Sequence, residues 1–509
     1  MNGGRIEHRA AKVSLVNGLS TVLTLAFQLV SVPVCLKYWG KESYGSWLAL
    51  MSAFLMLRAL DGGFVTYVGN ELNYLYHENT DELRRHLASA AAGIVVIGSL
   101  QLLIVGGALI FDPLAAILGM PVYHNEGIGA QLGLLVLMIS WVLTGSYLGI
   151  VHRLMIPAGM MYQAAWWAMT FQVAQFGSIM AAAVMRLGML QTSLLFAVVQ
   201  IIVYVASAHY VGRMLPEFYP WLRGANIRMG LRDLGHSLML TSSNVIQQSA
   251  TNGVVIVISA LAGPIAVPLF TTVRTLTNLW TSVTTVLTAP LLPEVVRIHV
   301  KGEVHKLAAI NQAFWVLVGS AVNGGALLFY PLIPLLYGQW TAHSVVLNKP
   351  LLALMLASVI ATNAGALMAL HLNGINSLRV VLATSVVRAV LALGAGAWGY
   401  RFLGLSSFGL GILAGELAAT LMTGCYFAKH ELASKDVPLS SQSLGPVTLS
   451  TGSALLFFLG SGLGWWSSRW SWLAALTVVA AASIWGWKTL GQESRTRLTS
   501  LATRRFRLS

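Results

Sequence analysis

The chain has 509 residues, of which 56% are hydrophobic and only 9% are charged, and its formal net charge is +14. Soluble domains contain roughly 25% charged residues, so this composition excludes a soluble enzyme and indicates a membrane protein with little soluble mass. In so apolar a chain, basic cytoplasmic loops explain the positive charge better than a nucleic-acid partner does.

Runs of about 20 mainly apolar residues, the length that crosses a bilayer, predict about fourteen transmembrane helices. The connections between them are short, and none is large enough to fold as a separate soluble domain. The predicted fold class is therefore an all-α polytopic membrane protein. In chain order, the expected spans are 13–36, 44–69, 89–111, 127–150, 159–185, 190–212, 236–260, 265–291, 308–335, 350–372, 379–400, 405–428, 444–466 and 470–489.

The distribution of lysine and arginine predicts the orientation of the chain. If the N-terminus is inside, most loop cations fall in cytoplasmic segments. The outer segments then contain only Lys37, Lys41, Arg186, Lys349, Arg401 and Arg469. Cytoplasmic loops of membrane proteins carry an excess of Lys and Arg, so both termini are expected in the cytoplasm.

A weak internal repeat predicts two related halves, because a shift of about 223 residues brings similar features into register. Gly40 falls on Gly263, and the pair Asn70–Glu71 falls on Pro293–Glu294. The expected domains are an N-terminal six-helix bundle (1–213), a cytoplasmic linker (214–235), a C-terminal six-helix bundle (236–430), an additional helix pair (444–489) and a basic cytoplasmic tail (490–509).

Five charged residues fall well inside the predicted spans. They are three arginines and two acids: Arg58, Arg274, Arg388, Asp61 and Glu416. Charged side chains are costly in hydrocarbon and commonly mark substrate or ion pathways. Each of the five is therefore a candidate functional residue.

Polar residues recur every three or four positions in three spans, which places them on one face of each helix. Such faces either pack against other helices or line a hydrated cavity. For the first span both interpretations stay open, whereas the arginine in the eighth favours a cavity. The stripes are Ser14, Asn17, Thr21, Thr24, Gln28 and Ser31; then Thr241, Asn244, Gln248 and Asn252; then Thr271, Arg274, Asn278, Thr281, Thr285 and Thr288.

Residues 36–76 carry a family resemblance. The segments YWGKESYGSWLAL, LDGGF and VGNELN, followed by a short charged loop, resemble the opening of bacterial polysaccharide exporters. These are O-antigen-type (Wzx-like) flippases of the multidrug/oligosaccharidyl-lipid/polysaccharide (MOP) superfamily. The family commonly has leucine after the aspartate, where this chain has Gly62, which adds backbone freedom.

The resemblance implies two six-helix bundles that rock about a central cavity in the bacterial inner membrane. The implied cargo is a polyprenyl-pyrophosphate-linked oligosaccharide, moved from the cytoplasmic to the outer leaflet. Glycosyltransferases and a polysaccharide polymerase are the expected partners beside membrane lipids, and no cofactor or enzymatic activity is expected.

The cargo chemistry assigns roles to the candidate residues. Guanidinium groups bind phosphate oxygens in pairs, so Arg58, Arg274 and Arg388 are candidates for the pyrophosphate. Side-chain amides of Gln28, Asn244, Gln248 and Asn278 are candidates for the glycan.

Several roles are possible for the two embedded acids. Asp61 could pair with Arg58 when the cavity is empty, or the two could form a permanent structural pair. Glu416 could pair with Arg388. A proton or sodium ion could also couple through Asp61 or Glu416. The sequence contains no GxxxxGK[ST] loop for ATP. The Gly62–Gly63 pair is expected to let its helix bend.

Two other functions stay open. A cation-coupled multidrug antiporter of the same superfamily would favour acids in the N-terminal half, whereas the embedded charges here are mostly cationic. A membrane glycan polymerase or transferase would need a sizeable outer loop or a cluster of acids or histidines, and the sequence shows neither.

Overall fold

The structure is a computed structural model that describes residues 3–110, 125–288, 291, 295, 297–299, 301, 304–374, 377–432, 441–465 and 469–490. Within these ranges the regular elements are all helices, and eleven are long and apolar enough to cross a membrane. The predicted all-α polytopic class is confirmed. Each of the expected spans coincides with a helix, although the spans at 159–185, 265–291 and 444–466 are less apolar than the eleven. The predicted basic tail lies outside the described residues from position 491 onward.

The chain divides into two compact units, unit 1 (Met1–Pro268) and unit 2 (Leu269–Ser509). The sequence-based division began the second bundle at position 236, before the seventh span. In the structure that span packs within unit 1. The division into two six-helix bundles and an additional helix pair stays a prediction.

Unit 1 is built around one long helix, α2 (Gly40–Glu78). The other helices of the unit are α1 (Gly3–Tyr38), α3 (Thr80–Ile110), α5 (Asn125–Ser140), α6 (Ser146–Arg153), α7 (Met161–Val184), α8 (Met189–Met214), α9 (Ile227–Gln248) and α10 (Val254–Ala262). Two π turns, η1 (Trp141–Gly145) and η3 (Ser249–Gly253), join α5 to α6 and α9 to α10, and a short 3-10 turn, η2 (Pro216–Phe218), follows α8.

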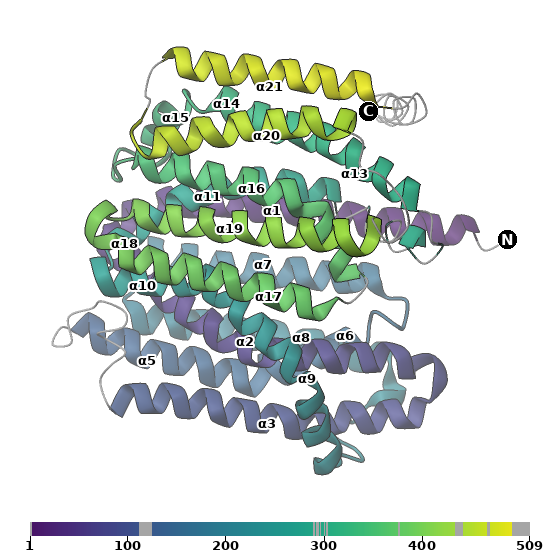
Figure 1. The fold of residues 1–509 in the computed structure, drawn as a ribbon. Helices are drawn as coiled ribbons and strands as arrows, with labels where there is room; N and C mark the ends of the chain where they lie inside the picture. The colour runs from purple at the N-terminus through teal and green to yellow at the C-terminus, as the bar shows by residue number, and fades with distance from the viewer. Residues whose placement is uncertain are drawn as a thin grey trace. The chain divides into compact units, whose positions relative to one another are not determined.

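Helix α2 packs against both α3 and α9, while α5 packs against α8 and α1 against α7. Figure 1 shows α3 and α5 running side by side. Two apolar clusters hold these helices together. One surrounds Trp47, Phe54 and Phe196, and the other surrounds Phe64 and Leu72.

Unit 2 consists of α11 (Ala266–Thr288, from position 269), α13 (Val304–Val318), α14 (Gly325–Phe329), α15 (Ile333–Trp340), α16 (Lys349–Gly374), α17 (Leu378–Val390), α18 (Gly396–Leu403), α19 (Ser406–Phe427), α20 (Ser441–Gly462) and α21 (Arg469–Thr489). Helix α16 is enclosed on most sides because it packs against α19, α17 and α20. The helix pair expected at 444–489 corresponds to α20 and α21, which lie side by side in Figure 1.

The aligned glycines of the proposed repeat both have a positive φ. Gly40 joins α1 to α2 with a φ of +79°, and Gly263 joins α10 to α11 with a φ of +77°. Only glycine adopts this left-handed conformation without a steric penalty. The shared turn geometry supports the alignment of the first and seventh spans.

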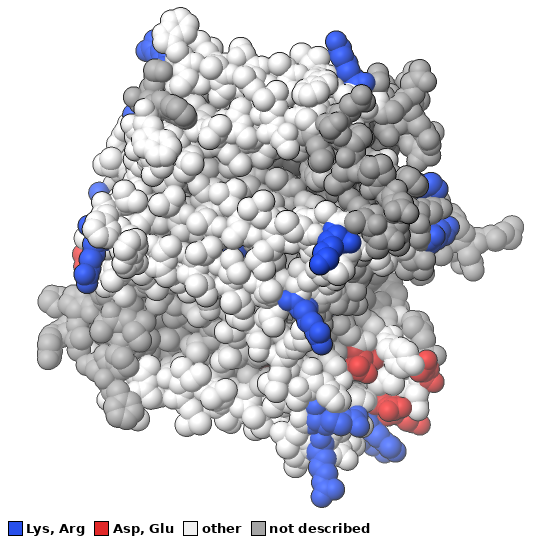
Figure 2. Space-filling view, viewed as in Figure 1, with Lys and Arg blue, Asp and Glu red and all other residues white. Residues whose placement is uncertain are grey.

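Figure 2 shows that the lysines and arginines drawn on the visible face gather mainly at the ends of helices. Exposed apolar residues such as Leu103, Leu143 and Leu421 lie along the helix flanks between them. This pattern is typical of helices whose flanks face lipid and whose ends face water.

Candidate functional site

Two charged side chains of α2, Arg58 and Asp61, lie one helical turn apart in its apolar stretch. Asp61 is enclosed, with only 1% of its surface exposed. Its Oδ2 atom accepts a hydrogen bond of 2.7 Å from Nε1 of Trp141 and another from the Ser146 hydroxyl. Hydrogen bonds to an ionised group are about twice as strong as neutral ones, so these donors offset part of the cost of burying the carboxylate.

Both donors come from one helix because the π turn η1 interrupts it. In a regular α-helix, residues five positions apart point about 140° away from each other. Here the Ser146 N–H bonds to the Trp141 carbonyl. This i→i+5 pattern brings positions 141 and 146 onto one face, and π turns of this kind occur frequently at functional sites.

Trp141 also contacts the cation of the pair. The guanidinium carbon of Arg58 lies 3.6 Å from the centroid of the Trp141 ring and 5.5 Å from that of Phe54. The indole therefore presents its electron-rich face to Arg58 and its N–H edge to Asp61. One aromatic ring therefore contacts both the half-buried cation and the buried acid.

The direct ion pair expected between Arg58 and Asp61 is not formed within the described part of the chain. The Arg58 guanidinium also has no hydrogen-bond partner among the described residues, although its side chain is half-buried. A guanidinium carries five N–H donors in a planar fork. These donors are available for a ligand.

Helix α9 lies directly against this part of α2. A Cβ atom at Gly63 would overlap the Thr241 backbone, and one at Gly62 would lie 3.1 Å from Nδ2 of Asn244. The glycine pair lies inside the continuous helix α2, and the expected bending during transport stays a prediction. Gly62 and Gly63 allow the two helices to approach closely, which places the Asn244 amide beside the charged segment.

The polar face of α9 continues toward its π turn. Nδ2 of Asn252 donates a hydrogen bond of 2.5 Å to Oε1 of Gln248. Both residues are half-buried. Two amides of the predicted stripe are therefore hydrogen-bonded to each other where α9 meets its π turn.

A buried glutamine of α3 supports the same segment. Gln101 is fully buried, and its Nε2 atom donates a hydrogen bond of 2.9 Å to the backbone carbonyl of Leu57. That carbonyl immediately precedes Arg58. Gln101 thus binds the α2 backbone at the peptide group that joins Leu57 to Arg58.

The stripe on α1 is partly an interhelical contact. The hydroxyls of Ser20 and Thr24 donate to Oε1 of Gln172 on α7 at 3.0 and 2.9 Å. Phe27 and Phe176 stack between the same helices at 5.2 Å. The packing interpretation of this stripe therefore holds around Thr24, and Gln28 is half-buried one turn further on.

In unit 2, Arg388 and Glu416 form an ion pair. Such a pair was one of the two roles expected for Arg388, the other being cargo binding. Nε of Arg388 donates to Oε2 of Glu416 at 3.1 Å, and the side chains are 31% and 19% exposed. Gly415 permits this contact, because a Cβ there would lie 3.1 Å from the Arg388 backbone. Glu416 is thereby committed to a cation in the same unit.

Arg274 is half-buried on α11, with its guanidinium carbon 5.7 Å from the centroid of the Phe270 ring. The stripe around it divides between packing and exposure. Thr271 and Thr288 are buried, whereas Asn278 and Thr285 are exposed. Part of this stripe is therefore enclosed by protein and part is accessible to solvent.

Sequence reasoning missed Trp141, Ser146 and Gln101. A tryptophan and a serine five positions apart do not share a face of a regular helix, so the pattern gave no signal for the first two. A polar residue in an otherwise apolar span was the available signal for Gln101. Within the described ranges, no group of three or more histidine, cysteine, aspartate or glutamate side chains is arranged to hold a metal.

No protein-family model and no curated protein matches the sequence. Solved structures do match the fold. The chain is similar to the lipid II flippase MurJ in an inward closed conformation, with a TM-score of 0.63 at 12% identity, over 92% of this chain and 97% of that one.

It is also similar to an inward-facing multidrug resistance MATE family transporter of the MOP superfamily, with a TM-score of 0.61 at 14% identity, over 83% of this chain and 99% of that one. The Vibrio cholerae MATE transporter VcmN in its bent form gives a TM-score of 0.55 at 17% identity, over 84% of this chain and 98% of that one. The chain therefore has the all-α polytopic fold seen in these structures.

Proposed function

We propose that the protein is a transporter that flips a polyprenyl-pyrophosphate-linked oligosaccharide from the cytoplasmic to the outer leaflet of the bacterial inner membrane. The observation that carries the proposal is the Arg58 guanidinium, stacked on Trp141 with its N–H donors unused among the described residues. Keeping such a cation in an apolar span is costly unless an anion meets it. A pyrophosphate supplies that anion.

The surrounding chemistry fits an amphiphilic cargo. Asn244, Gln248 and Asn252 follow one face of α9, which packs on α2 beside Arg58. Amides can donate to and accept from sugar hydroxyls. The fold neighbours are transporters, and one of them is a lipid II flippase, which supports transport over the polymerase or transferase alternative.

The experiment is a flipping assay on protein reconstituted into vesicles with a fluorescent polyprenyl-pyrophosphate oligosaccharide, read by a membrane-impermeant quencher. Arg58→Gln should lower the flipping rate at least about tenfold, because it removes charge-assisted hydrogen bonds to the pyrophosphate. Arg58→Lys should recover only part of the rate, since a lysine keeps the charge but not the fork.

Arg401→Gln, at an exposed cation of α18, is the matched control and should flip like the parent. If Arg58→Gln is correctly folded and flips at the parental rate, the proposed role of Arg58 is wrong.

One observation favours a second candidate, the cation-coupled multidrug antiporter. Asp61 is a buried carboxylate in the N-terminal unit, and the MATE transporters share the fold. Its coupling ion would be a proton or sodium at Asp61, because Glu416 already pairs with Arg388. Saturable binding of tetraphenylphosphonium, lost in Asp61→Asn and retained in Arg58→Gln, would favour this function over the flippase.

A further inference from the structure

The connector between α8 and α9 is a fixed aromatic structure at one end of unit 1. Phe218 is buried, and the Tyr147 hydroxyl donates to the Trp221 carbonyl at 3.0 Å. The Trp221 ring packs on Gly212 of α8, where a Cβ would lie 3.3 Å from it. Tyr219 and Trp221 meet edge to face at 5.7 Å. The two rings are therefore held in place.

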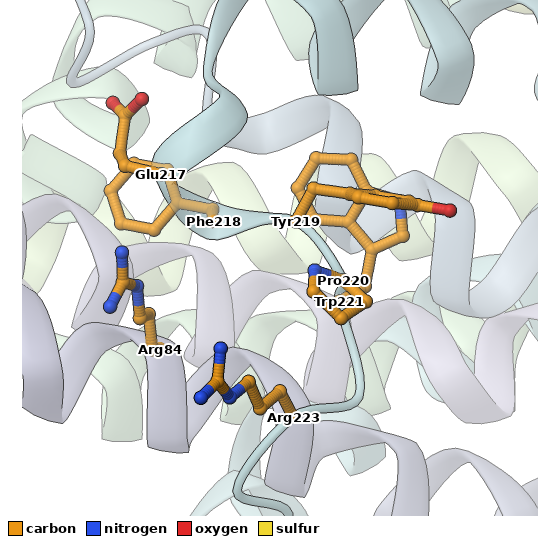
Figure 3. Close-up of a pocket in the computed structure, with 7 residues that line it drawn as sticks. All are labelled: Arg84, Glu217, Phe218, Tyr219, Pro220, Trp221 and Arg223. Carbon is orange, nitrogen blue, oxygen red and sulfur yellow. The ribbon is translucent and has the colours of Figure 1, made fainter.

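These two rings separate two adjoining pockets. The larger has a volume of about 490 Å³ and is lined from α6 and α8 by Leu148, Val205, Ala208, His209 and Arg213. The smaller, of about 50 Å³, lies between the connector and α3 and is lined by Arg84, Glu217, Phe218 and Arg223. Figure 3 shows the guanidinium groups of Arg84 and Arg223 pointing to the same side of the connector.

The charges around the pockets favour an anion. Three arginines line them against one acid, Glu217. Asp81 lies 3.6 Å from Arg84 but is itself largely exposed, with 85% of its side chain accessible. Exposed pairs of this kind contribute little, so Arg84 stays available to a ligand.

The position of the pockets favours a lipid. Arg213 stands in the last turn of α8, where an apolar span ends, and Tyr219 is 64% exposed beside it. Tyrosine, tryptophan and arginine concentrate at this depth because their apolar parts meet acyl chains and their polar ends meet headgroups. An apolar cavity beside a cationic one fits a molecule with a chain and a phosphate.

We propose that the paired pockets bind an anionic phospholipid. Its phosphate lies on Arg84 and Arg223 in the smaller pocket, and an acyl chain occupies the larger cavity with Arg213 at its rim. This lipid site is separate from the Arg58 segment and does not depend on the identity of the transported cargo.

The test measures thermal unfolding of the purified full-length protein in detergent with added phosphatidylglycerol, phosphatidylcholine or inorganic phosphate. Phosphatidylglycerol should raise the unfolding midpoint, and neither of the others should match it. In the double variant Arg84→Gln/Arg223→Gln, the apparent affinity for phosphatidylglycerol should fall about fivefold for each cation removed. Arg401→Gln, at an exposed cation elsewhere, should respond like the parent.

A second variant tests the cavity without altering charge. Leu148→Trp fills the larger pocket and should weaken the response to phosphatidylglycerol while both small-pocket arginines remain. An undiminished response in either variant would overturn the proposal, as would an equal response to inorganic phosphate, which would indicate a simple anion site. Displacement of phosphatidylglycerol by a polyprenyl-pyrophosphate would overturn the phospholipid assignment and make the pockets part of the cargo path.

Discussion

Trp141 stabilises two opposite charges of α2, and its two contacts can be separated by substitution. Trp141→Phe keeps an aromatic face for Arg58 but removes the N–H that donates to Asp61 at 2.7 Å. Because the lost hydrogen bond ends on a buried carboxylate, we expect the free energy of unfolding to fall by about 2 kcal/mol. Titration with a denaturing detergent in micelles measures this change.

Trp315→Phe is the matched control, because its N–H donates at 3.0 Å to a neutral acceptor, the Ala364 carbonyl. Loss of this hydrogen bond should lower the free energy of unfolding by only about 1 kcal/mol. If both substitutions lower the free energy of unfolding equally, the charge on Asp61 does not strengthen its hydrogen bond from Trp141.

The pair Arg388–Glu416 can be distinguished from a cargo site by a double-mutant cycle. Each of Arg388→Gln and Glu416→Gln should destabilise the protein, because each leaves the other charge without its partner. The double variant should recover about 1 kcal/mol of free energy of unfolding relative to the sum. It should also transport at the parental rate if the pair is structural. Loss of transport in a stable double variant would instead assign Arg388 to the cargo.

Among the elements, the contact between α2 and α9 depends on a side chain being absent. Gly63→Ala would drive a methyl group into the Thr241 backbone, and a backbone cannot move aside as a side chain can. We expect a loss of about 2 kcal/mol in the free energy of unfolding. Gly62→Ala should cost less, since it meets only the end of the Asn244 side chain at 3.1 Å. Gly149→Ala, which meets nothing within 4 Å, is the control.

If Gly63→Ala and Gly149→Ala have the same free energy of unfolding in a detergent titration, α2 and α9 are not in close contact at Gly63.

The helices themselves could be predicted because apolar runs of spanning length are a strong signal, and each expected span is matched by a helix. The charged residues of the site could be predicted, but their hydrogen-bond partners could not. Arg58 and Asp61 stand out as charges in an apolar span, but their partner depended on a π turn, which apolar periodicity does not reveal. Gly62 and Gly63 suggested flexibility, which stays a prediction, and the structure shows that they also permit close packing against α9, which a glycine pattern alone does not reveal.

At the scale of the molecule, the division into two six-helix bundles and an additional helix pair stays a prediction. Hydropathy locates spans but carries no information on which spans pack together. The close approach of Gly63 and Thr241, a long-range contact, places the seventh span in unit 1. The loop charges, by contrast, predict an orientation that can be measured.

Single cysteines at exposed connectors test that orientation after Cys35 and Cys425 are replaced by alanine. Met185 and Leu222 are 65% and 58% exposed, between α7 and α8 and between α8 and α9. A membrane-impermeant maleimide should label Met185→Cys in intact cells and Leu222→Cys only after permeabilisation, because the second connector carries the arginines. The reverse pattern would place both termini outside.

The π turn after α5 also has a consequence for how this sequence diverges. Deleting one residue between positions 141 and 146 would convert the i→i+5 turn into a regular i→i+4 turn. The serine would then follow the tryptophan by four positions and stay on the same face, and α6 would keep its orientation. A relative with a regular helix and its hydroxyl one position nearer to the tryptophan could therefore satisfy the carboxylate equally well.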